Sequence, residues 1–64
     1  MNDATPNSKV YELDEVTHIV MNSILAGLRR GDMVEYEGRR VRRLTYWDDP
    51  ERGPLIRIDY CEEI

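Results

Sequence analysis

Apolar residues recur at three- and four-residue spacing between Asp14 and Arg30, which is the pattern of an amphipathic helix. Asp14 suits the N-cap, and Leu13 before it suits a hydrophobic contact with the first turns. Arg29 and Arg30 favour the negative end of the helix dipole, and Gly31 suits the left-handed conformation that ends many helices. The pattern therefore predicts one helix over this segment.

The period of the apolar residues changes to two after this helix, which is typical of strands. The alternation covers residues 33–37, 40–47 and 55–60, with a turn at Gly38 and a loop over residues 48–54. Residues 9–13 form either a short further strand or an earlier turn of the helix. The predicted fold is α+β, with one amphipathic helix on a three-stranded antiparallel meander and a possible extra N-terminal strand.

The second strand has a parity problem. The two-residue turn of the first hairpin places Val34 opposite Val41, with both side chains directed inward. Leu44 and Tyr46 then fall on the opposite face. A β-bulge near residues 42–43 corrects this, because one extra residue moves all later side chains to the other face. Trp47 is then expected on the outer face, beside the acidic loop.

The length of 64 residues allows one small domain, which we place at residues 9–64 after a disordered tail at residues 1–8. Cys61 is the single cysteine and His18 the single histidine, so we expect no internal disulfide, metal site or cofactor. We expect a cytoplasmic protein with no membrane partner, because the N-terminus lacks signal-peptide features and no apolar run is long enough to span a bilayer.

The net charge of −4 is unevenly distributed. Residues 1–28 carry one Lys and four acids, residues 29–43 carry six Arg and three acids, and residues 44–64 carry two Arg and six acids. Arg provides eight of the nine basic residues, and its planar guanidinium binds carboxylates or phosphates in bidentate fashion. This distribution suits internal ion pairs or a protein partner at least as well as nucleic acid.

One candidate site is the basic strand with its aromatic end: Arg39, Arg40, Arg42, Arg43, Tyr46 and Trp47. Guanidinium groups on phosphates and aromatic rings on bases are the chemistry of nucleic-acid-binding sheets. We favour internal pairing of these charges, since the hairpin register places Glu35 opposite Arg40 and Asp32 opposite Arg43, and Asp59 lies within reach of a further arginine.

A second candidate is the acidic C-terminal third: Asp48, Asp49, Glu51, Asp59, Glu62 and Glu63. Such a cluster either mimics a phosphate backbone or only keeps the chain soluble, and solvation is the commoner role. The helix is a third candidate. Its apolar side chains cover about 240° around the helix axis, whereas an apolar stripe of about 100° is enough to pack a helix against a core. Met21, Leu25 and Leu28 are therefore available for a partner or a second copy unless the N-terminal segment covers them.

No phosphate loop, nucleophile motif or metal-ligand spacing is present in the sequence, and His18 has only Asp14 at helical spacing. We therefore expect no enzyme but a protein-binding module, such as a small acidic regulator or inhibitor of a larger, nucleic-acid-binding protein. Its expected partner-binding residues are Trp47, Asp48, Asp49, Glu51, Met21 and Leu25. A nucleic-acid-binding sheet built on the basic strand is the first alternative, and a structural homodimer subunit is the second.

Overall fold

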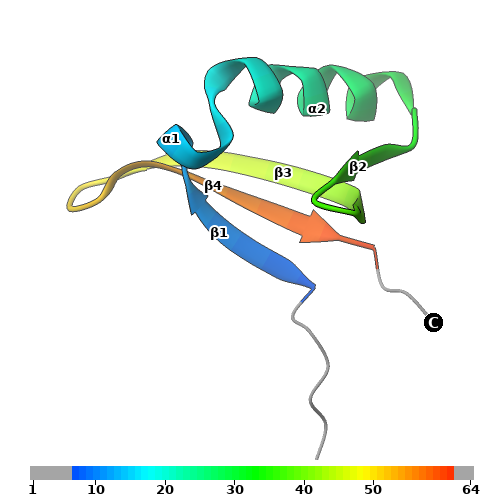
Figure 1. Ribbon diagram of the computed structural model, residues 1–64. Helices are drawn as coiled ribbons and strands as arrows, with labels where there is room; N and C mark the ends of the chain where they lie inside the picture. The colour runs from blue at the N-terminus through cyan, green and yellow to red at the C-terminus, as the bar shows by residue number, and fades with distance from the viewer. Residues whose placement is uncertain (1–6, 62–64) are drawn as a thin grey trace, which may run out of the picture.

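The computed structural model describes residues 7–61, which form a four-stranded antiparallel sheet with helices on one face (Figure 1). The elements are β1 (Ser8–Glu12), α1 (Leu13–Val16), α2 (His18–Arg30), β2 (Val34–Tyr36), β3 (Arg39–Asp49) and β4 (Gly53–Tyr60). The strands lie in the order β1-β4-β3-β2. The predicted α+β class is confirmed, and the N-terminal segment forms a fourth strand.

β1 pairs with β4, the last strand, so the two ends of the described chain lie side by side. The predicted tail at residues 1–8 lies outside the described residues except for Asn7 and Ser8. Ser8 begins β1, and the carbonyl of Asn7 accepts a hydrogen bond from the backbone of Tyr60.

The prediction of one continuous helix from Asp14 was wrong, because Thr17 interrupts it with φ 73° and ψ 152°. Thr17 instead caps α2, where its hydroxyl accepts a hydrogen bond from the Val20 amide at 3.3 Å. The cap of α1 is Glu12, which forms a capping box with Glu15. The short first helix lets the chain leave the edge of the sheet and bury Leu13 before α2 begins. The predicted helix end is confirmed by Gly31 at φ 84°.

The first hairpin has the predicted two-residue turn, with Tyr36 paired to Arg39. Glu37 and Gly38 both have positive φ, 55° and 77°, which matches the right-handed twist of the strands. The second turn is shorter than the loop predicted at residues 48–54. The Asp49 carboxylate accepts the amides of Glu51 and Arg52 at 2.8 and 3.0 Å, so the strands stay paired up to Asp49.

The predicted bulge is confirmed, because the pairing of β3 with β4 shifts register between Val41 and Arg43. The extra residue brings Val41 and Leu44 onto the same, helix-covered face. It also places Trp47 on the other face, as the bulge predicts.

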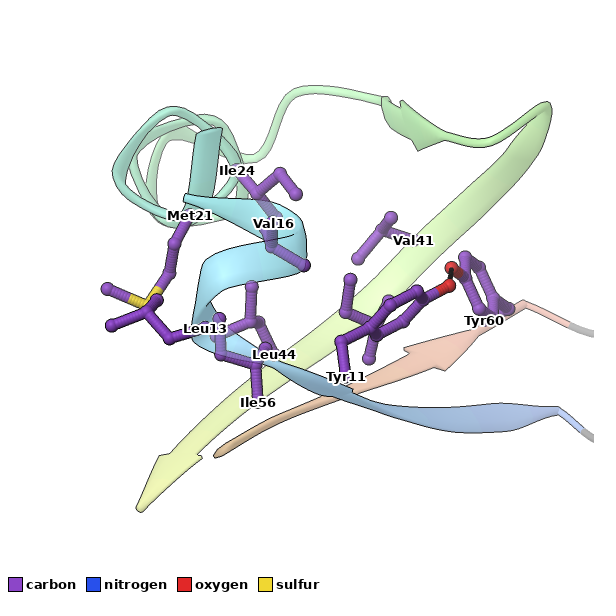
Figure 2. Packing of buried hydrophobic residues seen from close by; sticks show 10 residues of the cluster. Tyr11, Leu13, Val16, Met21, Ile24, Val41, Leu44, Ile56 and Tyr60 are labelled. Atoms are coloured by element: carbon purple, nitrogen blue, oxygen red, sulfur yellow. Dashed lines mark hydrogen bonds between the residues drawn. The ribbon is translucent and has the colours of Figure 1, made fainter. Parts of the chain in front are cut away.

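The core lies between the helices and this inner face (Figure 2). Ten buried residues form it: Tyr11, Leu13, Val16, Met21, Ile24, Val41, Leu44, Ile56, Ile58 and Tyr60. Met21 therefore does not provide the free helix surface that the sequence predicted, and Leu25 and Leu28 are partly buried against the same core. The 240° arc was derived for an unbroken helix, whereas the break at Thr17 lets α1 and α2 bury separate stripes and leaves Ile19 exposed.

Candidate interaction surface on the open sheet face

One face of the sheet carries no helix (Figure 1). Strand register and the alternation of side chains place three rows of residues on it. From β1 through β4 to β3 the rows are Glu12, Leu55, Trp47; Val10, Arg57, Thr45; and Ser8, Asp59, Arg43. We call these nine residues the open face.

The first row gives one end of the open face an apolar pair, Leu55 and Trp47, beside the exposed Glu12, whose carboxylate lies 3.9 Å from Arg52. Leu55 is 2% exposed although it is not part of the core under the helices, so its neighbours on the open face keep it from water. Trp47 stands directly opposite Leu55 in the ladder and is itself half-buried. Val10, in the next row, is 43% exposed. This end therefore presents an indole and a valine around a covered leucine.

The third row makes the other end charged. Arg43 Nε lies 3.5 Å from Asp59 Oδ2, and Arg57 Nε lies 3.3 Å from Asp59 Oδ1. The Asp59 side chain is 15% exposed, whereas Arg43 and Arg57 are 62% and 47% exposed. Two guanidinium groups share one recessed carboxylate, so the accessible charge at this end is positive and most of its N–H donors face solvent.

The bulge and the hairpin divide the predicted arginine strip. The guanidinium of Arg39 lies 4.1 Å from the centre of the Tyr60 ring on the helix side, and Tyr46 is on that side too. Arg40 stands opposite Glu35 in the hairpin register, as predicted, while the exposed Arg42 falls in the bulge. Arg43 is the one of the four among the nine residues of the open face, while Arg40 alternates with the inward Val41 and is directed to the same side of the sheet beyond them.

The predicted pair of Asp32 with Arg43 was wrong. β2 begins only at Val34, and Asp32 instead accepts a hydrogen bond from Arg30 Nε at 3.0 Å. Asp59 is the acid that pairs with Arg43, which confirms that it can reach a strand arginine.

The acidic loop residues do not converge. Asp49 is engaged in its turn, where the amides of Glu51 and Arg52 lower the pKa of its carboxyl. Asp48 is exposed on the helix side opposite Pro54, and Glu51 is exposed at the tip. Of the other acids in the predicted group, Asp59 lies on the open face, and Glu62 and Glu63 lie outside the described residues. Strand alternation places Asp49 on the side of Trp47 and Asp48 on the opposite side, so the loop acids do not form one acidic surface.

A tyrosine cluster that the sequence did not predict closes the other end of the core (Figure 2). The Tyr11 hydroxyl lies 2.6 Å from that of Tyr60 and donates to Glu37 Oε1 at 2.9 Å. Tyr36 packs edge-on against the Tyr11 ring at 5.7 Å. Burial raises the pKa of Tyr11 and of Tyr36, so both stay protonated and neither suits a general base. The cluster is a structural feature of the core. It forms because residues far apart in the sequence meet when the strands pair.

Within residues 7–61, no group of three or more His, Cys, Asp or Glu side chains is arranged to hold a metal ion. His18 is exposed at the start of α2, and Cys61 is a partly buried free thiol after β4. No helix in this part of the chain combines the length and the hydrophobicity needed to cross a membrane.

Comparisons with family models, with curated proteins and with solved structures gave no match to this chain. Function is therefore inferred from the geometry of its surfaces.

Proposed function

We propose that this protein is a non-enzymatic protein-binding module that contacts its partner through the open face. The observation that carries the proposal is that one whole face of the sheet lacks a helix and combines Trp47, Val10 and two outward arginines. Trp and Arg are the residue types that most often dominate binding energy at protein interfaces. A face with an apolar end and a charged end also has a defined orientation for its partner.

The chemistry of the open face favours an acidic partner segment. Asp59 is recessed between Arg43 and Arg57, so their guanidinium groups are what a partner meets first. A carboxylate from the partner accepts bidentate hydrogen bonds from such a group. An apolar side chain beside that carboxylate then lies against Trp47 and Val10. The proposed partner is a protein segment that presents a carboxylate next to an apolar residue.

Nucleic acid fits the open face less well. Residues 7–61 contain nine basic and ten acidic residues, a net charge of −1, and such domains lack the strong positive field of most nucleic-acid-binding folds. Trp47 is the single aromatic residue among the nine of the open face, whereas base-stacking sheets use several rings. Tyr46, predicted beside it, is on the helix side.

Site-specific photo-crosslinking tests this proposal. A photoreactive amino acid replaces Val10 on the open face or, as the matched control, Ile19 on α2, which is 81% exposed. Nuclease-treated native lysate should give a discrete protein adduct from position 10 that Arg57→Glu and Trp47→Ala both weaken. Equal adducts from position 19 would show that the open face is not the contact surface.

A direct titration separates the nucleic-acid alternative. Fluorescence anisotropy of labelled single-stranded DNA and RNA at low salt should show no binding by the full chain. A contrary result would be binding that weakens steeply as salt rises and is lost when Arg43 and Arg57 are both replaced by Gln. That result would show that the open face binds nucleic acid.

A further inference from the structure

β3 has a free edge for most of its length. β2 pairs only with Arg39 to Val41, whereas β3 continues to Asp49. From Arg43 to Asp49, no strand within the described part of the chain pairs with β3 on the side away from β4. Seven residues of a long strand are thus available for pairing on that side.

The backbone groups that point to this edge follow from two hydrogen bonds. The Tyr60 amide donates to Asn7 beside β1, and the Cys61 amide donates to the Arg40 carbonyl of β3. Bonding direction alternates along an antiparallel strand, so the odd-numbered residues of β4 bond to β3. Their partners Arg43, Thr45 and Trp47 bond back to β4. The N–H and C=O groups of Leu44, Tyr46 and Asp48 therefore point to the free edge.

Side chains beside this edge are accessible. Tyr46 is 45% exposed, and Thr45 and Asp48 are also exposed. Unpaired N–H and C=O groups at such an edge form a template for another strand, which proteins usually cover, shorten or pair.

We infer that this edge pairs with the same edge of a second copy of the chain, antiparallel, about a two-fold axis at Tyr46. Residues 43–49 of one copy then face residues 49–43 of the other, so the whole free edge is used. A register centred one residue earlier would overlap β2 at Val41, and one centred later would leave part of the edge unpaired. In the register centred on Tyr46, β3 of each copy ends at Asp49, opposite Arg43 of the other copy and just short of Val41, where the pairing with β2 stops.

Charge complementarity favours this partner. β3 starts with four arginines and ends in Asp48 and Asp49. In the register centred on Tyr46, Arg43 is the one arginine inside the paired segment, and it stands opposite Asp49 of the second copy. The other free edge, β1, has no such match, because self-pairing about Val10 sets Lys9 opposite Tyr11.

This association leaves the proposed binding surface accessible. A two-fold axis perpendicular to the sheet keeps equivalent faces on the same side, so the dimer presents two open faces side by side and both sets of helices opposite them. Binding of a partner at the open face and dimerisation through the β3 edge can therefore be tested independently.

Sedimentation velocity with a proline variant tests the pairing. The Tyr46 N–H points away from β4, so Tyr46→Pro removes an edge donor and no bond to β4, and edge strands tolerate proline. The full chain should be a dimer whose dissociation constant rises roughly tenfold or more in Tyr46→Pro. Tyr46→Thr keeps the N–H and should remain a dimer. Circular dichroism checks that each variant is folded. A wild-type monomer at high concentration, or a folded proline variant that dimerises fully, overturns the inference.

Disulfide trapping gives a second readout that does not require the proline variant to fold. Opposed residues of a hydrogen-bonded antiparallel pair have Cα atoms about 5.5 Å apart, within the range of a disulfide. In a Cys61→Ser background, Tyr46→Cys should form a covalent dimer rapidly on mild oxidation. Val10→Cys, equally exposed but beside the other edge, should not. Equal trapping at both positions overturns the inference.

Discussion

The hydroxyl groups of Tyr11 and Tyr60 lie 2.6 Å apart although 49 positions separate the residues in the chain. Tyr11 also donates to Glu37 at 2.9 Å, so it joins β1, β4 and the first hairpin turn. Because both tyrosines are buried, each hydroxyl depends on the other or on Glu37 for its hydrogen bonds. In this series of hydrogen bonds, Tyr11 is the middle member, between Glu37 and Tyr60, and Tyr60 is a terminal member.

Tyr11→Phe should destabilise the protein more than Tyr60→Phe. The first change removes two hydrogen bonds and leaves the buried Tyr60 hydroxyl unpaired, at a cost of about 2 kcal/mol. The second leaves Tyr11 its bond to Glu37 and costs about 1 kcal/mol. Urea denaturation measures both free energies of unfolding. Equal losses would contradict the central position of Tyr11.

The same cluster predicts a loss of stability in alkali. Burial and the bonds to Tyr60 and Glu37 raise the pKa of Tyr11 above that of the unfolded chain, and burial also raises that of Tyr36. A raised tyrosine pKa contributes stability that is complete below the unfolded value of about 10 and lost as pH rises above it. Urea midpoints from pH 8 to 11 should fall above pH 10, and less steeply in Tyr11→Phe. An identical slope in that variant would exclude Tyr11 as a source.

Thr17 has a positive φ that a β-branched side chain rarely adopts. Thr17→Gly relieves backbone strain of about 1–3 kcal/mol, whereas glycine is a poorer N-cap by only about a few tenths of a kcal/mol. The free energy of unfolding should therefore rise. Thr17→Ala keeps a Cβ and removes the cap of α2, so it should lower stability by about 1 kcal/mol. Thermal denaturation of both variants compares the signs. A glycine variant no more stable than the alanine variant would contradict the strain.

Gly27 lies where α2 meets β2, and a Cβ added there would stand 2.7 Å from Val34 Cγ2. Alanine normally stabilises a helix interior over glycine by about 1 kcal/mol. Here Gly27→Ala should instead destabilise the protein by about 1 kcal/mol or more, because stiff Val34 cannot move aside freely. In a Val34→Ala background the same change should become stabilising. A double-mutant cycle by urea denaturation measures this reversal, and additive effects would argue against the contact.

Asp49 holds the turn between β3 and β4 through the amides of Glu51 and Arg52. These bonds lower the pKa of its carboxyl, so its contribution is complete above the unfolded value of about 3.9 and lost as pH falls through the folded value. Asp49→Ala should lower the midpoint of thermal unfolding at pH 6, with the difference narrowing toward pH 2. Glu51→Ala, at the exposed tip, should change little at either pH.

Local features were predictable from the sequence where neighbouring residues alone decide them. Gly31 ends α2 because its left-handed conformation lets its N–H bond to carbonyls of the last turn. Gly38 closes the first hairpin because the turn needs a positive φ at that position. The bulge near Arg42 followed from a conflict of parity that no unshifted register could resolve. The α+β class, the approximate strand positions and the outward location of Trp47 rested on such short-range patterns.

Only the tertiary structure decided which surfaces remain exposed. Pairing β1 with β4 forces the chain to turn at Thr17, which buries Met21 and assembles the tyrosine cluster. Pairing β3 with β4 sets Asp59 between Arg43 of β3 and Arg57 of β4. Periodicity specifies which side chains share a face of one element, but the neighbour of that face depends on contacts between residues far apart in the chain. That is why the open face and the free edge of β3 emerge from the fold.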